Sequence, residues 1–143
     1  MNPTIHVIAT TFDGTEAALR TAMPAAIRQN ARVVLLVLVQ SAPADTEQSP
    51  WATRALIDRY DEMAKPFNYP VQIRLSLTPA SGKAVARLVP RNTTVFIGGA
   101  ARVWWPSPEE RLAASLRRRE FEVVFVGCNS GRPRVRSGVH AHA

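Results

Sequence analysis

An almost uninterrupted apolar segment, ARVVLLVLVQ at residues 31–40, restricts the possible folds more than any other part of the chain. Its valines and leucines favour a β-strand. A strand with one wet face alternates apolar and polar residues, whereas a strand that is apolar throughout is typical of a parallel sheet covered by helices on both faces. Residues 31–40 therefore predict a buried strand in an α/β domain.

Further strand and helix patterns alternate along the chain. The other expected strands are residues 5–12, 71–77, 93–99 and 121–127. The expected helices are residues 13–30, 51–67, 81–89 and 107–119. This alternation predicts a three-layer, Rossmann-like α/β sandwich, in which a five-stranded parallel sheet has helices on both faces. Residues 71–77 alternate apolar and polar side chains, which indicates a half-exposed edge strand.

The length and composition fit one domain followed by a short tail. The chain has 143 residues, of which 46% are hydrophobic, enough for a core. We expect residues 1–128 to form the domain and residues 129–143 to form a basic, disordered tail with little to bury. No apolar run reaches the roughly 18–20 residues of a membrane span, and the N-terminus lacks the basic segment of a signal peptide. We therefore expect a cytoplasmic protein without a membrane partner.

Charge, cysteine and histidine usage narrow the classes of partner and cofactor. The formal net charge is +7, but no basic stretch is interleaved with aromatic residues, so we do not expect nucleic acid as a partner. Cys128 is the only cysteine, which excludes an internal disulfide. The histidines and this cysteine form no metal-ligand pattern, and His140 and His142 lie in the expected tail. No metal site is predicted.

The stretch VFIGGAARVWWPSPEERLAASL, residues 95–116, reads as a strand, a loop of small residues and a helix. Such an arrangement often holds a phosphate at the helix N-terminus. Ser107 is the expected N-cap of this helix. Ligands of open parallel sheets bind where the strand order reverses, so we expect any site near Asp13 and Gly98, after the first and fourth strands.

At this point the sequence resembles the universal stress protein family. The resemblance rests on VIATTFDGTEAALRTAMPAAIRQNARVVLLVLV, with its Asp13-Gly14-Thr15 turn, and on TTVFIGG and EVVFVG in the closing half. It covers roughly residues 4–127. The resemblance implies a five-stranded, usually dimeric domain from a family with nucleotide-binding and non-binding branches.

The loop after the fourth strand departs from the pattern of the ATP-binding branch, which is Gly-x-x-Gly, nine residues, then Gly-Ser or Gly-Thr. Gly98 takes the first position, but Ala101 and Arg111 replace the later glycines. The positions carried over from the family as remnants of a nucleotide site are Asp13, Gly98, Gly99 and Ser107. From the residues alone, Asp13 can also be a helix cap, and the glycines can also serve only to let the chain turn sharply after the strand. No cofactor is expected, with ATP or another adenine nucleotide as the alternative.

Trp104 and Trp105 stand in this loop. An indole can fill the space of a nucleotide, stack on a base or cover a subunit interface. Packing or an interface is favoured over ligand contact. The leading hypothesis for a lost nucleotide site is steric: the indole and proline rings occupy the space of a triphosphate.

Two enzyme-like patterns were weighed. Cys128, Gly131 and Arg134 have the spacing of the phosphate-binding loop of cysteine phosphatases, but the helix that lowers the thiol pKa is missing from the sequence that follows. SGKA at residues 81–84 lacks the other glycine and the hydroxyl residue of a phosphate loop. Both are interpreted as chance matches.

The sequence thus favours a non-enzymatic regulatory or interaction domain with lost or weakened nucleotide binding. We expect a homodimer that pairs the fifth strand with its copy through Val123, Val124, Phe125 and Val126. The alternatives are a stress protein that binds an adenine nucleotide through a reshaped loop, and an enzyme similar to cysteine phosphatases.

Overall fold

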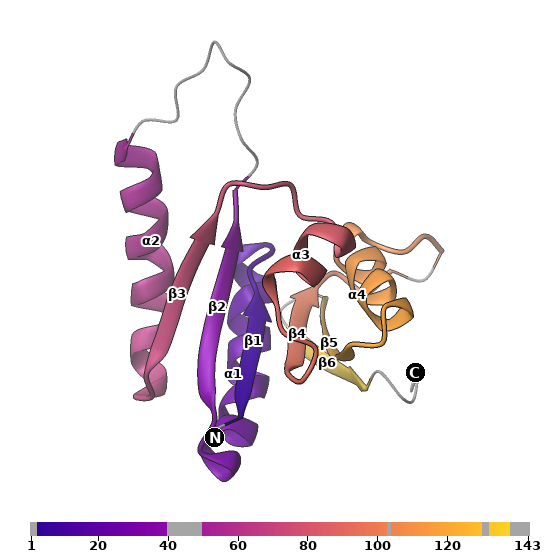
Figure 1. Cartoon of the computed structure of the whole chain (residues 1–143), viewed down its shortest axis with the longest axis horizontal. Coiled ribbons are helices and arrows are strands. Elements are labelled where there is room, and N and C mark those ends of the chain that lie inside the picture. The colour runs from indigo at the N-terminus through magenta and orange to yellow at the C-terminus, as the bar shows by residue number, and fades with distance from the viewer. Residues whose placement is uncertain (1–2, 40–49, 103, 130–131, 138–143) are drawn as a thin grey trace.

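A computed structural model describes residues 3–39, 50–102, 104–129 and 132–137 (Figure 1). The strands are β1 (Thr4–Ile8), β2 (Arg32–Leu38), β3 (Val71–Ser76), β4 (Thr94–Gly99), β5 (Glu122–Asn129) and β6 (Arg132–Ser137). The helices are α1 (Phe12–Gln29), α2 (Pro50–Ala64), α3 (Gly82–Leu88) and α4 (Pro108–Arg118), with a short 3-10 turn, η1 (Lys65–Phe67), after α2.

The strands form one sheet in the order β3-β2-β1-β4-β5-β6. β1 to β5 run parallel, which confirms the predicted five-stranded parallel sheet. The order reverses between β1 and β4, where Ile8 lies opposite Ile97. The carboxyl ends of these two neighbouring strands therefore form the switch point expected from the sequence.

Two core clusters, one on each face of the sheet, explain the apolar character of β2. Val33 and Leu35 belong to the cluster that contains α1 and Tyr60 of α2. Leu36 belongs to the cluster that contains Val85 of α3 and residues of α4. Because successive side chains of a strand point to opposite faces, a strand between two apolar layers needs apolar residues at both sets of positions.

The predicted edge strand is confirmed in β3, which ends the sheet on one side. Val71, Ile73 and Leu75 pack against the α1 cluster. Gln72 and Arg74, which alternate with them, are exposed. The period-2 pattern therefore follows from a strand whose second face no helix covers.

The first strand ends at Ile8, four residues before its predicted end at residue 12, whereas α1 begins at Phe12, within one residue of its predicted start. Thr11, not Asp13, is the N-cap, and its Oγ1 accepts the N–H of Gly14 at 3.0 Å. α1 contains Pro24 and continues past it as one helix.

The prediction for the tail is also wrong over residues 132–137, which form β6 and pair antiparallel with β5 (Figure 1). The pairing runs from Asn129 opposite Arg132 to Val124 opposite Ser137. An edge strand gains main-chain hydrogen bonds without needing an apolar face, so a low apolar content does not exclude it. The arginines at 132, 134 and 136 follow the strand period of two. The sheet therefore has a sixth strand.

Candidate functional site

The carboxyl ends of β1 and β4 are joined by short hydrogen bonds around the start of α1. The Thr10 hydroxyl donates to the carbonyl oxygen of Gly98 at 2.5 Å. The Thr10 N–H donates to Oγ1 of Thr15 at 2.9 Å, and the Thr15 hydroxyl donates to the Thr11 carbonyl at 2.7 Å. Sequence reasoning missed Thr10, because its role depends on a strand that lies 88 residues away.

Gly14 and Gly98 bring the backbones of α1 and β4 into direct contact. A Cβ atom on Gly98 would lie 1.9 Å from the carbonyl oxygen of Gly14, and a Cβ on Gly14 would lie 2.5 Å from the oxygen of Gly98. Both distances are far below van der Waals contact, so neither position tolerates a side chain. These glycines are required by packing within the chain, which leaves no gap between the two backbones for a phosphate.

The side chain of Glu109 covers Gly99. A Cβ on Gly99 would lie 2.4 Å from Cγ of Glu109. The open face that a glycine offers to a ligand is therefore taken by the first turn of α4.

Glu110 occupies the hydrogen-bond donors of the loop that precedes α4. Its Oε1 accepts the N–H of Ser107 and the N–H of Arg102, each at 3.0 Å. In return, Oγ of Ser107 accepts the N–H of Glu110 at 3.1 Å, which completes a capping box. Ser107 is confirmed as the N-cap and is fully buried. A carboxylate of the chain itself thus sits on amides of the kind that hold phosphates at helix N-termini.

Of the four predicted site residues, three lie in the interior at the switch point and one lies at the surface. Gly98, Gly99 and Ser107 are buried, whereas Asp13 is exposed in the first turn of α1, beside Gly14. A negative charge in the first turn stabilises a helix by its favourable interaction with the helix dipole. The structure thus brings these residues to the same edge of the sheet, but the buried ones contact other parts of the chain.

The free space at this edge is small. A pocket of about 140 Å³ is lined by Ala9, Thr10, Ala80, Pro108, Glu109 and Leu112. Small-molecule sites commonly measure roughly 300–1,000 Å³. The volume of this pocket lies below that range.

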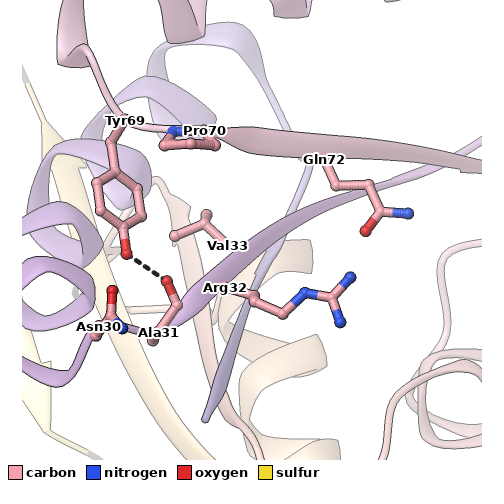
Figure 2. Close-up of a pocket in the computed structure, with 7 residues that line it drawn as sticks. All are labelled: Asn30, Ala31, Arg32, Val33, Tyr69, Pro70 and Gln72. Carbon is pink, nitrogen blue, oxygen red and sulfur yellow. Dashed lines mark hydrogen bonds between the residues drawn. The ribbon is translucent and has the colours of Figure 1, made fainter. Parts of the chain in front are cut away.

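Larger hollows lie at the opposite, amino-terminal end of the strands. One of about 370 Å³ lies between the end of α1 and the start of β3, where the Tyr69 hydroxyl donates to the Ala31 carbonyl at 2.5 Å (Figure 2). Among the described residues that line it, Arg32 alone is charged, and its guanidinium and the Gln72 amide lie on the side away from Tyr69 (Figure 2). A second hollow of about 410 Å³ shares Tyr69 and Pro70.

The steric hypothesis for Trp104 and Trp105 is wrong. Their exposed fractions are 88% and 75%, so neither indole fills the space at the switch point. The groups that contact Gly98, Gly99 and the loop amides are instead Gly14, Glu109 and Glu110.

The remaining candidate residues do not form a second site in the described parts of the chain. Cys128 lies within β5 opposite Pro133, and a strand rather than a helix N-terminus follows it. Gly131 of the phosphatase-like spacing, and His140 and His142, lie outside the described residues. No cluster of three or more potential metal ligands occurs among the residues that the structure describes.

A buried histidine that the sequence did not single out lies beside the switch strands. His6 of β1 is 2% exposed, and its Nδ1 lies 2.8 Å from Oγ1 of Thr93. Burial, and secondarily the positive charge of Arg74, lowers the pKa of His6 to about 4. The imidazole ring of His6 is therefore neutral at pH 7, and we interpret His6 as a structural residue of the interior.

The predicted dimer residues lie in the interior of the chain. Val123, Phe125 and Val126 are buried, and Val124 packs against the α1 cluster. Both edges of β5 are paired, one with β4 and the other with β6. The apolar character of this strand is thus explained by the fold of one chain.

Comparison with known proteins places this architecture among the universal stress proteins at the level of fold. No protein-family model and no curated protein matches the sequence. A universal stress protein family member from Burkholderia pseudomallei is similar in structure, with a TM-score of 0.61 and 14% identity over 89% of this chain and 97% of that chain.

Two further solved structures contain nucleotides. A universal stress protein in complex with cAMP has a TM-score of 0.60 at 14% identity, covering 88% of this chain and 98% of that chain. An Arabidopsis thaliana family protein with AMP bound has a TM-score of 0.52 at 14% identity, covering 88% and 93%. The chain therefore has a universal-stress-protein-like α/β fold. Along the part of the chain that the structure describes, no helix combines the length and apolarity of a membrane span.

Proposed function

We propose that this chain is a non-enzymatic regulatory or interaction domain with a universal-stress-protein-like fold, in which the position of the nucleotide is closed by the chain's own carboxylates. The observation that carries this proposal is the contact of Glu110 Oε1 with the N–H groups of Ser107 and Arg102. These are the donors that a phosphate at the start of α4 would need.

Electrostatics supports closure. A phosphate at this helix N-terminus has to displace the Glu110 carboxylate from two charge-assisted hydrogen bonds, which are stronger than neutral ones. Glu109 and Glu110 both lie in the first turn of α4 and would repel the incoming anion. They already interact favourably with the helix dipole, so the dipole offers a phosphate little further gain.

The experiment is a titration of the purified full chain with ATP, AMP and cAMP by calorimetry, together with mass analysis of any nucleotide released on denaturation. We expect no bound nucleotide and no binding at micromolar concentrations. Glu110→Ala removes one negative charge and frees two N–H groups, so this variant is expected to bind nucleotide measurably more tightly than the unsubstituted chain.

Glu62→Ala is the matched control, because it removes the same charge from an exposed position on α2, where Glu62 pairs with Lys65. A gain in Glu110→Ala and none in Glu62→Ala supports closure by Glu110. Micromolar binding of ATP by the unsubstituted chain would overturn the proposal.

The second candidate function is binding of an adenine nucleotide through a reshaped loop. The observation that favours it is the presence of cAMP and AMP in two proteins of similar fold. It requires Glu109 and Glu110 to turn away from Gly99 and from the loop amides. Nucleotide released from the purified chain in stoichiometric amount would favour this function over the first.

The homodimer is a separate proposal. Because β6 occupies the free edge of β5, a dimer that pairs two copies of β5 requires β6 to leave that edge. The molar mass of the full chain in light scattering decides between this exchange and a monomer.

A further inference from the structure

All three tryptophans of the chain have highly exposed side chains. The exposed fractions are 81% for Trp51, 88% for Trp104 and 75% for Trp105. Leu77 is 61% exposed. Single exposed apolar residues are ordinary, but several large ones at one end of a molecule are typical of an interaction surface.

These four side chains lie on connections at the carboxyl end of the sheet. Trp51 lies in the first turn of α2, after β2, and Leu77 directly follows β3. Trp104 and Trp105 lie between β4 and α4. The start of α2, the tip of β3 and the loop before α4 all extend from the end of the sheet toward which the parallel strands point (Figure 1). We refer to Trp51, Leu77, Trp104 and Trp105 as the carboxyl-end apolar surface.

Two exposed arginines, Arg102 and Arg111, flank the tryptophan pair in the sequence. Of the carboxylates at this edge, Glu110 lies on the loop amides and Glu109 lies against Gly99, whereas Asp13 is exposed in the first turn of α1. The chain as a whole carries a formal charge of +7. An exposed indole pair with basic neighbours is complementary to a partner that is both apolar and anionic.

We propose that the carboxyl-end apolar surface docks onto the interface of an anionic lipid bilayer, which replaces the expectation from the sequence that the chain has no membrane partner. Tryptophan is enriched at the level of lipid headgroups, and exposed arginines gain electrostatic attraction to anionic lipids. The four side chains come from three separate connections at one end of the sheet, so a partner that contacts all of them has to be extended. Three of the four residues lie in connections and Trp51 lies in the first turn of α2, so docking of this surface needs no membrane span.

This inference deepens the proposed function, because it names the partner class of a domain that acts by binding. The two still fail separately. Loss of vesicle binding leaves the nucleotide result untouched, and nucleotide binding by the unsubstituted chain does not alter how the indoles meet lipid.

The test uses the full chain with vesicles of phosphatidylglycerol and, in parallel, of phosphatidylcholine. We expect co-sedimentation with the anionic vesicles and a shift of tryptophan emission to shorter wavelength, both weakened by high salt. The double variant W104A/W105A is expected to bind anionic vesicles at least about tenfold more weakly, because two large apolar side chains no longer leave water. Ile27→Ala, which truncates an exposed side chain near the far end of α1, is the matched control and should bind normally.

The charge contribution has its own variants. Arg102→Glu and Arg111→Glu are each expected to weaken anionic binding by about fivefold or more. Arg28→Glu makes the same change in net charge in the last turn of α1 and should have a smaller effect.

Three results would overturn the proposal. The first is an absence of anionic vesicle binding. The second is equal binding to both vesicle types. The third is emission that is already at short wavelength in buffer and does not respond to vesicles, which would mean that protein covers the indoles, with light scattering showing whether a second copy does so.

Discussion

The buried His6 makes stability depend on pH in a window that the structure defines. The Thr93 hydroxyl donates its only proton to the Thr4 carbonyl. The contact of 2.8 Å between Thr93 Oγ1 and His6 Nδ1 therefore requires Nδ1 to donate, which fixes the neutral tautomer. A proton added to Nε2 would place a positive charge in the interior on the same side of the sheet as Arg74.

The sign follows from the two pKa values. The pKa of His6 is lowered from 6.5 to about 4 on folding, so the unfolded chain takes up a proton first as the pH falls. Stability is fully present above pH 6.5 and is lost progressively down to about pH 4. At about 1.4 kcal/mol per pKa unit, His6 alone accounts for a loss of about 3 kcal/mol by pH 4. This is a large share of the roughly 5–15 kcal/mol that stabilises a domain.

The assay is urea unfolding of the full chain and of His6→Gln at pH 7.5, 5.5 and 4.5. Carboxylates affect both proteins alike, and a constant loss from the substitution cancels when each protein is compared with itself. We expect the unsubstituted chain to lose about 2–3 kcal/mol more than His6→Gln over this range. Parallel pH profiles for the two proteins would refute the reasoning.

Three further perturbations test the fold and the closed site. Gly98→Ala forces a Cβ onto the carbonyl oxygen of Gly14, so we expect a loss of about 1–3 kcal/mol or more in urea unfolding, and an unchanged midpoint would contradict this contact. Ser107→Ala removes the N-cap of α4 and should cost about 1 kcal/mol, with no change expected if the capping box is not formed. Deleting residues 130–143 removes β6 and uncovers the edge of β5. We therefore expect the molar mass in light scattering to rise to that of a dimer or larger species. A monomer would show that the uncovered edge of β5 does not self-associate.

The sheet was predictable because the pattern of apolar residues in each strand depends on how many of its faces are buried. The apolar run of β2 indicates a strand that is covered on both faces, and the alternation of β3 indicates a strand that is covered on one face. The sixth strand was missed because β6 is held by backbone pairing, which composition does not reveal, although its alternating arginines follow the strand period.

The site was predictable in position and not in contacts. The order of the strands placed Gly98 at the switch point, and the spacing of Ser107 and Glu110 is that of a capping box. That Glu110 also accepts the N–H of Arg102 depends on the path of the loop. The orientation of Trp104 and Trp105 depends on the same path. The sequence showed that this loop contains large side chains, but it did not show that they point into solvent.

The touching glycine backbones of α1 and β4 also limit how this edge can move. A pocket bounded by side chains opens when a rotamer changes, which takes little energy and little time. Here the main chains themselves are in contact. A ligand can enter between them only if the N-terminal part of α1 separates from the sheet, which would also expose its buried alanines and Leu19. Entry would therefore be coupled to partial unfolding, and hydrogen exchange at the start of α1 would report it.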